Sequence, residues 1–180
     1  MRWIWIDKFT EFEPGKRAVS IKNVTLAEEH LHDHFPGFPT MPASLMIEGM
    51  AQTGGILVGF ERKFKEKVIL AKINKATFHE IVRPGDQLTL EAIIENIADE
   101  AASIVGTIKC GETLIADIRM MFSHIDNNIG GLEFPKENFV FNDQFMGLLR
   151  FYLPDGTIEL PLKQRYPIQS EPGSPLLAFF

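Results

Sequence analysis

The sequence predicts an α+β fold in which a curved antiparallel β-sheet is wrapped around one long central α-helix. Three observations lead to this prediction. One strongly apolar helix is expected over residues 42–61, strand-like segments precede and follow it, and the later segments are separated by short turns. Strands on both sides of a single enclosed helix are typical of a two-layer α+β arrangement around one core.

The chain opens with a predicted β-hairpin. Residues 3–12 and 17–25 each alternate or run apolar, and Glu13-Pro14-Gly15-Lys16 between them is typical of a turn. Charged residues end the helix, and four further strand-like segments follow, with Cys110-Gly111-Glu112 as the expected turn between the last two. These segments are residues 68–78, 87–97, 103–109 and 113–122.

The predicted helix has an unusual composition for a surface helix. Its apolar side chains spread around the circumference instead of forming one stripe, so we expect it to be covered on most sides. Four glycines each cost up to about 1 kcal/mol relative to alanine in a helix. They are Gly49, Gly54, Gly55 and Gly59. Their presence indicates that a sheet or a partner helix approaches the backbone closely.

The last part of the chain differs in character from residues 1–125. The sequence predicts a hinge at 127–131, and six of the eleven prolines lie beyond it. Seven of the fifteen phenylalanines also lie there, which is too much apolar surface for a solvated disordered tail. The sequence therefore predicts a C-terminal extension, residues 126–180, packed on the body, with a short helix at 144–151 and a short strand at 157–162.

Composition excludes some classes of function. A net charge of -6 and a pI near 5.4 argue against a nucleic-acid binder, which usually has a basic face. Cys110 is the only cysteine, so no intramolecular disulfide is possible and a reducing compartment is expected. The first apolar run is too short for a secretion signal, and no run reaches the ~20 residues that span a bilayer. We therefore expect a cytoplasmic protein.

The run from His34 to Glu48 is the most informative motif. Prolines 36, 39 and 42 fix their own φ and keep the preceding residues out of the helical region, so His34 is expected on a rigid, extended segment. Histidine titrates near neutrality and a buried carboxyl can be held protonated, so the pair suits a reaction that removes one proton and delivers another. A carboxyl in so apolar a helix is costly without a partner or a function.

This motif resembles the 3-hydroxyacyl-acyl-carrier-protein dehydratases of fatty acid synthesis, in which a His-Phe-Pro-Gly-x-Pro-x-x-Pro-Gly turn precedes a carboxylate by fourteen residues. His34 and Glu48 have that separation. The resemblance extends through Met50-Ala51-Gln52 and Val82-Arg83-Pro84-Gly85-Asp86, and it covers about residues 1–125. It implies the hot dog fold and a homodimer, or a higher oligomer built from dimers, with sites between subunits. The glutamate at position 48 is similar to that of the family branch with general chain-length use, since the branch that also isomerises its product has aspartate there.

The resemblance also implies a reaction, the reversible loss of water from a 3-hydroxyacyl thioester carried on the phosphopantetheine of acyl carrier protein, with no further cofactor. Neutral His34 would take the C2 proton, and Glu48 of the neighbouring subunit would protonate the departing hydroxyl. The Ala43 amide, at the start of the helix, would stabilise the charge that develops on the thioester oxygen. Gln52 is expected to hydrogen-bond Glu48, and Gly37, Phe38 and Pro42 to shape the turn or contact substrate.

Two features depart from the family pattern. Ala43 stands where relatives have glycine, although its amide donor is retained. The family's leading helix and its His-Arg-x-Pro-Phe segment are missing, and we expect the C-terminal extension to take over that packing. Acyl carrier proteins are acidic, so docking should use a basic cluster. The nearest one in sequence comprises Arg62, Lys63, Lys65 and Lys67.

Other interpretations stay open at this point. His30, His32 and His34 alternate with Asp33 among them, which on an extended backbone would put three imidazoles on one face as zinc ligands. The dehydratase motif explains His34 without a metal, so no metal site is assigned. The implied fold also serves acyl thioesterases and could serve a non-catalytic acyl-binding protein, and fold alone does not choose among these.

Overall fold

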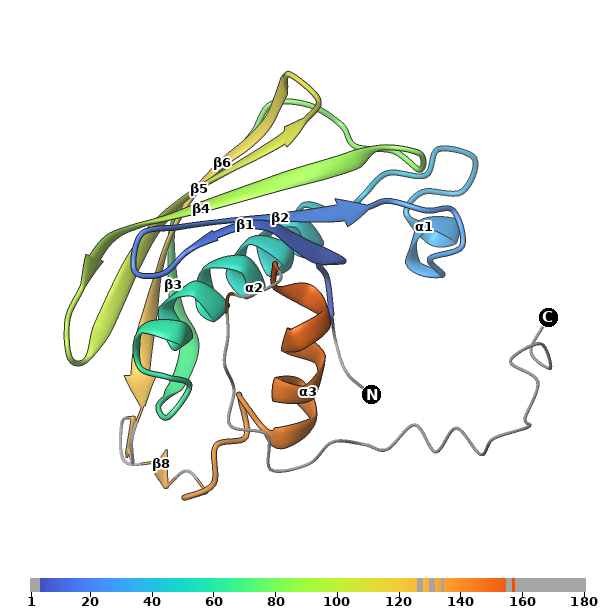
Figure 1. Ribbon diagram of the computed structural model, residues 1–180. Helices are drawn as coiled ribbons and strands as arrows, with labels where there is room; N and C mark the ends of the chain where they lie inside the picture. The colour runs from blue at the N-terminus through green and yellow to red at the C-terminus, as the bar shows by residue number, and fades with distance from the viewer. Residues whose placement is uncertain (1–3, 126–127, 130–131, 134, 155–156, 158–180) are drawn as a thin grey trace, which may run out of the picture.

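The computed structural model describes residues 4–125, 128–129, 132–133, 135–154 and 157. Its main sheet has six antiparallel strands in the order β1-β2-β4-β5-β6-β3. Their bounds are β1 Lys8–Glu13, β2 Arg17–Asn23, β3 Lys67–Phe78, β4 Gln87–Ile97, β5 Ala101–Cys110 and β6 Thr113–Ile125. The sheet curves over helix α2, Ala43–Glu61 (Figure 1). The predicted hot dog fold is confirmed.

Helix α2 forms the centre of the core, as its composition predicted. Met50, Leu57 and Val58 are fully buried. The helix packs against β2, β3, β4, β5 and β6 of the main sheet. A Cβ atom on Gly54 would collide with Ile104 of β5, so glycine is needed there for the sheet to approach the helix. Close packing of this kind explains why a helix rich in glycine is stable in this position.

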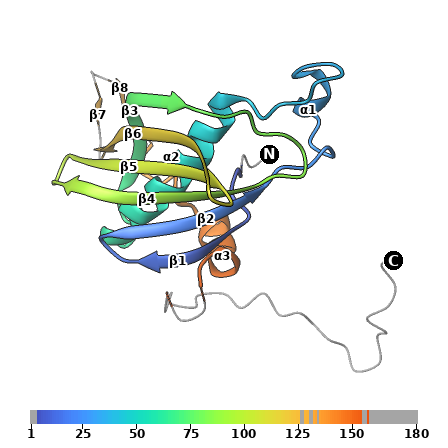
Figure 2. The same cartoon turned by 90° about the horizontal axis from the view of Figure 1, so that it is seen from above.

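The two edges of the sheet are β1 and β3 (Figure 2). Strand β3 pairs with β6 from Lys67 opposite Ile125 to Phe78 opposite Ala116, with register shifts after Leu70 and after Ile73. No described strand lies on its other edge, and residues 71–75 are exposed. An edge with unpaired backbone groups can add a strand from another chain.

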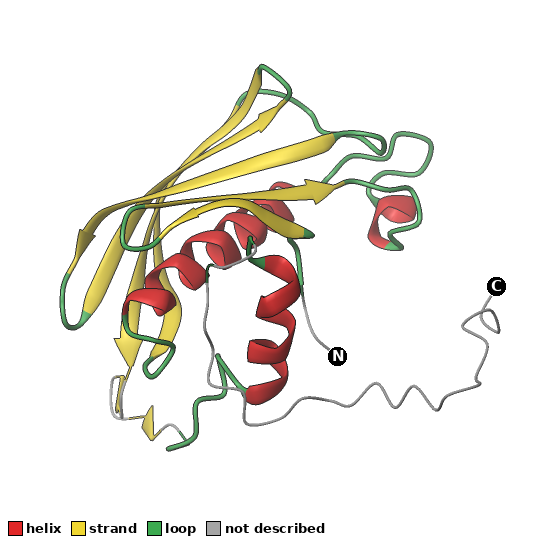
Figure 3. Cartoon of the chain, in the orientation of Figure 1, coloured by secondary structure: helices red, strands yellow, loops and turns green. Residues whose placement is uncertain are grey.

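Smaller elements lie around this core (Figure 3). They are α1, His30–Asp33; β7, Asn128–Ile129; β8, Leu132–Glu133; and α3, Asp143–Tyr152. The helix predicted at 144–151 is confirmed as α3, whereas α1 and the β7–β8 pair were not predicted. Of the strand predicted at 157–162, only Thr157 lies within the described residues, and it is not in a strand. No helix among the described residues is long and apolar enough to cross a membrane.

Residues 135–153 lie against the body on the side of α2 that faces away from the sheet (Figure 1). Phe141 packs edge to face against Phe64, with 5.0 Å between ring centroids, and Leu149 and Leu153 are buried. Asn142 caps α3 by accepting a hydrogen bond from the Phe145 amide at 3.0 Å. The boundary at residue 125 between a body and an extension stays a prediction.

Candidate active site

The proline-rich turn before α2 has a fixed backbone. The amide of Phe35 donates to the carbonyl of Phe38 at 3.1 Å, and the amide of Phe38 donates back at 2.9 Å. Gly37 has a φ of +74°, in the left-handed region where a side chain is disfavoured. The Thr40 amide then donates to the His34 carbonyl at 2.8 Å. The predicted turn therefore needs glycine at 37, and it closes directly onto His34.

The His34 imidazole is held in one tautomer. Its Nδ1 lies 2.8 Å from the Thr40 carbonyl oxygen. Because a carbonyl can only accept, Nδ1 carries the proton of the neutral ring and Nε2 has the lone pair. Nε2 has no hydrogen-bond partner among the residues that the structure describes, and the half-buried ring stacks on Phe35. This arrangement suits Nε2 for accepting a proton from a substrate.

The start of α2 presents unpaired amides. Pro42 is its N-cap, and its carbonyl accepts from the amides of both Leu45 and Met46. Within the described chain, the amides of Ala43 and Ser44 have no acceptor, and both residues are exposed. Unpaired N–H groups at a helix N-terminus, with its positive dipole end, favour an oxygen that carries negative charge. The Ala43 amide predicted as a donor is therefore available.

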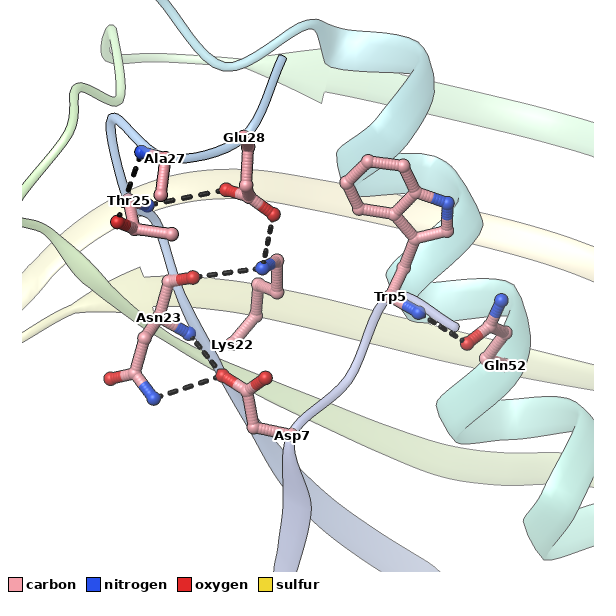
Figure 4. Close-up of polar contacts among 8 residues, drawn as sticks. All are labelled: Trp5, Asp7, Lys22, Asn23, Thr25, Ala27, Glu28 and Gln52. Atoms are coloured by element: carbon pink, nitrogen blue, oxygen red, sulfur yellow. Dashed lines mark hydrogen bonds and ion pairs between the residues drawn. The ribbon is translucent and has the colours of Figure 1, made fainter. Parts of the chain in front are cut away.

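Glu48 is positioned by Gln52, one turn further along α2. The Gln52 side-chain NH₂ donates to Glu48 Oε1 at 2.9 Å, as predicted. Gln52 Oε1 in turn accepts from the backbone amide of Trp5 at 2.8 Å (Figure 4). Because an amide N–H must meet the oxygen of Gln52, its NH₂ group has to face Glu48, and the orientation of the side chain is settled.

The segment that carries Trp5 is itself anchored, a feature that the sequence did not reveal. The Asp7 carboxylate accepts from both the backbone and the side-chain amide of Asn23, at 2.6 and 2.9 Å (Figure 4). Lys22, almost buried, donates to Glu28 at 2.6 Å and to the Asn23 carbonyl at 2.8 Å. The Asp7 contacts tie the chain ahead of β1 to the end of β2, and this same segment carries the Trp5 amide that holds Gln52 beside Glu48.

Glu48 and Gln52 line a cavity of about 460 Å³. The cavity lies between α2, β3, the N-terminal segment and the C-terminal extension. The apolar or aromatic residues around it are Ile4, Ile6, Ala51, Gly55, Ile56, Val68, Ile69, Leu70, Phe122, Phe139, Val140, Phe141, Phe145 and Tyr152. Asn142 is the third polar residue of the lining, beside Glu48 and Gln52. A few polar side chains at the wall of a mostly apolar cavity are typical of a ligand site.

The predicted site residues fall into two groups within one chain. His34 does not line the cavity of Glu48. Gly37 and Phe38 line a second hollow with Arg83, whose guanidinium lies 4.5 Å from the centre of the Phe38 ring. The turn that follows His34 lies beside the motif of residues 82–86, because the amide of Met41 donates to the carbonyl of Val82 at 2.9 Å. One chain by itself does not bring the histidine and the carboxyl to a common cavity.

The geometry assumed for a zinc site is wrong. Residues 30–33 form the helical turn α1, and at 100° per residue His30 and His32 point to different sides. His32 Nε2 lies 2.8 Å from the Leu26 carbonyl, and the His30 ring packs edge to face on Trp5. In the part of the chain that the structure describes, no three histidine, cysteine or acidic side chains are grouped as metal ligands.

The basic cluster predicted for docking is only partly available. Arg62 makes ion pairs with Asp99 at 2.9 Å and with Glu66 at 3.8 Å. Lys67 is buried and donates to the carbonyl of Lys136 at 3.3 Å. Lys63 and Lys65 are exposed. Lys67 is therefore a structural residue that binds the extension, and its inclusion in a docking surface was wrong.

Sequence comparison places these motifs in a known family. The family model described as the FabA-like domain matches residues 3–120. A FabZ 3-hydroxyacyl-[acyl-carrier-protein] dehydratase from Caldanaerobacter subterraneus is 43% identical over 121 residues, which cover 67% of this chain and 86% of that protein. A FabZ dehydratase from Clostridium kluyveri is 40% identical over 127 residues, covering 70% of this chain and 88% of that protein.

Solved structures support the fold. The dehydratase heterocomplex ApeI:P from Xenorhabdus doucetiae superposes with a TM-score of 0.58 at 16% identity, covering 68% of this chain and 83% of that chain. A thioesterase from Haemophilus influenzae superposes with a TM-score of 0.53 at 17% identity, covering 65% and 76%. Because dehydratases and thioesterases both match at such low identity, this likeness concerns the fold alone. The sequence matches go further, and by them this chain belongs to the FabA-like family, alongside the FabZ 3-hydroxyacyl-[acyl-carrier-protein] dehydratases.

Proposed function

We propose that this protein is a 3-hydroxyacyl-acyl-carrier-protein dehydratase of fatty acid biosynthesis, which converts 3-hydroxyacyl thioesters reversibly into trans-2-enoyl thioesters. The observation that carries the proposal is the state of His34. Its Nδ1 is committed to the Thr40 carbonyl and its Nε2 is left as a base, on a turn whose helix carries Glu48 fourteen residues later. Family membership supports the same reaction.

The reaction uses each group once. His34 Nε2 takes the C2 proton of the substrate, and the electron pair of that C–H bond moves toward the thioester carbonyl. The amides of Ala43 and Ser44 are donors for the negative charge on its oxygen. As the electrons return, the C3–O bond breaks and the protonated Glu48 carboxyl gives its proton to the departing hydroxyl. Water leaves, and the proton held by His34 must return to Glu48 before the next cycle.

We further propose that the site is completed across a homodimer. In one chain, His34 does not line the cavity that contains Glu48, so we infer that the base of one copy meets the acid of another. Two features support pairing. The edge of β3 carries no described strand, and the turn beside His34 exposes the rings of Phe35 and Phe38, 56% and 46% accessible. Exposed aromatic rings at a functional turn are typical of a surface that another chain covers.

The carrier-protein substrate is the second partner that we propose. The protein would bind the phosphopantetheine-linked acyl group in the cytoplasm, where Cys110 stays reduced, and would need no bound cofactor. Of the predicted basic cluster, Lys63 and Lys65 remain suited to docking an acidic carrier. Replacing both with glutamate should slow turnover of carrier-bound substrate more at low salt, with coenzyme A thioesters unaffected. Equal rates for the variant and the original protein would remove these lysines from the docking surface.

The reaction is tested by an enoyl-thioester hydration assay. Its readout is the loss of ultraviolet absorbance as the conjugated thioester is hydrated. We expect His34→Ala and Glu48→Gln each to lose at least ~100-fold in kcat, the scale of a positioned general acid or base. Glu61→Gln, an exposed carboxyl at the end of the same helix, is the matched control and should keep full activity. Release of free thiol without hydration would instead identify a thioesterase, and acyl binding without either reaction would identify a non-catalytic protein.

A further inference from the structure

We propose that the C-terminal extension, through residues 139–152, forms the end wall of the pocket that holds the acyl chain, and so sets the chain length of the substrate. The inference rests on the proposed function, because it assigns the occupant of the cavity that contains Glu48. Phe139, Val140, Phe141, Phe145 and Tyr152 all line that cavity. The family match ends at residue 120, so this wall lies outside the part shared with the family.

The cavity runs along α2 away from the reacting group. Glu48 and Gln52 are the polar side chains that α2 contributes to it, Asn142 of the extension is a third, and Gly55 and Ile56 continue the lining one turn further along the helix. Phe141 covers Gly59, where a Cβ atom would lie 2.5 Å from the phenylalanine ring. Gly59 is eleven residues beyond Glu48, about 16 Å along a helix axis. A thioester whose carbons C2 and C3 lie at Glu48 would therefore direct its alkyl tail toward Phe141.

The size and chemistry of the cavity fit an alkyl chain. Its volume of about 460 Å³ lies within the range of ~300–1,000 Å³ usual for small-molecule sites. Most of its lining consists of aliphatic and aromatic side chains from α2, β3, β6 and the extension. An alkyl tail gains by leaving water for such a lining, whereas a polar ligand would lose hydrogen bonds there.

The wall is held in place by contacts that do not depend on a ligand. The side-chain NH₂ of Asn138 donates to the carbonyls of Phe64 and Glu66, at 3.0 and 3.2 Å. Its oxygen accepts from the amides of Val140 and Phe141, at 3.1 and 2.9 Å. Asn138 thus ties the wall to the loop after α2. A wall fixed in this way can limit the length of a chain, because it does not yield to a longer one without loss of these bonds.

Two substitutions move the wall in opposite directions. Phe145→Ala removes a half-buried ring that lines the cavity and lengthens it, and Val140→Phe fills the space beside Phe141 and shortens it. Phe151→Ala is the matched control, because Phe151 lies on the same helix, is 84% exposed and does not line the cavity. Circular dichroism and the melting temperature establish that each variant is folded.

The measurement is the affinity for saturated coenzyme A thioesters of increasing length, butyryl, octanoyl and dodecanoyl, by calorimetry. Val140→Phe should weaken the longest chain about 10-fold relative to butyryl, and Phe145→Ala should shift the preference toward longer chains by a similar factor, the scale of one or two methylenes in an apolar pocket. Phe151→Ala should reproduce the original protein. Length profiles of both wall variants that coincide with the original profile would overturn the inference.

Binding and turnover keep the two proposals separable. If the protein binds long acyl chains and the wall variants shift the length profile, but enoyl thioesters are not hydrated, the proposed function fails while the pocket assignment stands. If hydration proceeds with the same length preference in all variants, the function stands and the wall does not set chain length. If no acyl thioester is bound at any length, the assignment of the cavity is wrong.

Discussion

At the scale of single residues, the candidate site depends on two side chains that each have two polar atoms, one of which already makes a hydrogen bond to the backbone. His34 commits Nδ1 to the Thr40 carbonyl, and Gln52 commits its oxygen to the Trp5 amide. The nitrogen of Gln52 is thereby directed to Glu48, and Nε2 of His34 is left to accept a proton from a substrate. The contact of Gln52 with Glu48 was predicted. The contacts with Thr40 and Trp5 could not be predicted from spacing, because these partners are backbone groups whose position depends on the folded turn and, for Trp5, on a contact between residues far apart in sequence.

Gln52 is expected to act by positioning Glu48. Gln52→Leu keeps the apolar bulk but removes the donor to Glu48 and leaves the Trp5 amide without this acceptor. We expect kcat to fall about tenfold with KM little changed, since the substrate contacts remain while the acid is less well oriented. The hydration assay measures both constants. A rise in KM at constant kcat would show that Gln52 instead contacts the substrate.

His30 is expected to make stability depend on pH. Its pKa is lowered from 6.5, chiefly by burial, its ring packs on Trp5, and its Nε2 is buried without a partner in the described structure. The unfolded chain therefore binds a proton more readily, so the free energy of unfolding falls as pH drops below about 6.5. His30→Phe should flatten this slope in melting temperatures measured across that range. An equal slope in the variant would exclude His30 as its source.

At the scale of elements, most of the fold could be predicted because hydrophobic pattern and turn chemistry agree along the chain. The hairpin, the central helix and the four later strands are all present, and their bounds lie within three residues of the predicted ones except at the start of β1, which begins at Lys8, five residues later than predicted. Turn α1 could not be predicted, because four residues with three polar side chains carry no periodic signal. The order of the strands in the sheet was not predicted either, because the hydrophobic pattern of one strand does not say which strand it pairs with.

Adjacent glycines of α2 should respond oppositely to alanine. A Cβ on Gly55 would lie 3.4 Å from Phe122, an ordinary contact, so Gly55→Ala should raise the free energy of unfolding by about 0.5–1 kcal/mol through helix propensity. A Cβ on Gly54 would collide with Ile104, so Gly54→Ala should lower it by about 1–3 kcal/mol. Urea unfolding measures both values. Equal effects would contradict the packing described for this helix.

At the scale of the whole molecule, the site that we propose depends on the assembly of two chains and on the extension. The sequence indicated both catalytic candidates, yet it could not show that His34 does not line the cavity that contains Glu48, because that depends on how the turn leaves α1 and enters α2. It also could not show that Phe141 and Phe145 reach the Glu48 cavity. Their apolar character predicted that they would be buried, but not where. The place where they pack depends on the shape of the surface they meet, such as the space beside Gly59 that the Phe141 ring fills.

Mixing two inactive variants tests the shared site directly. In a dimer of one His34→Ala chain and one Glu48→Gln chain, one site loses both groups and the other keeps both. If chains exchange freely, half of the dimers are mixed, so about a quarter of the original activity should return, as two-fold symmetry requires. Each variant mixed with itself is the control and should stay inactive. A tagged chain measures how far the two variants exchange. If both groups acted within one chain, no mixture would restore hydration even where exchange is complete.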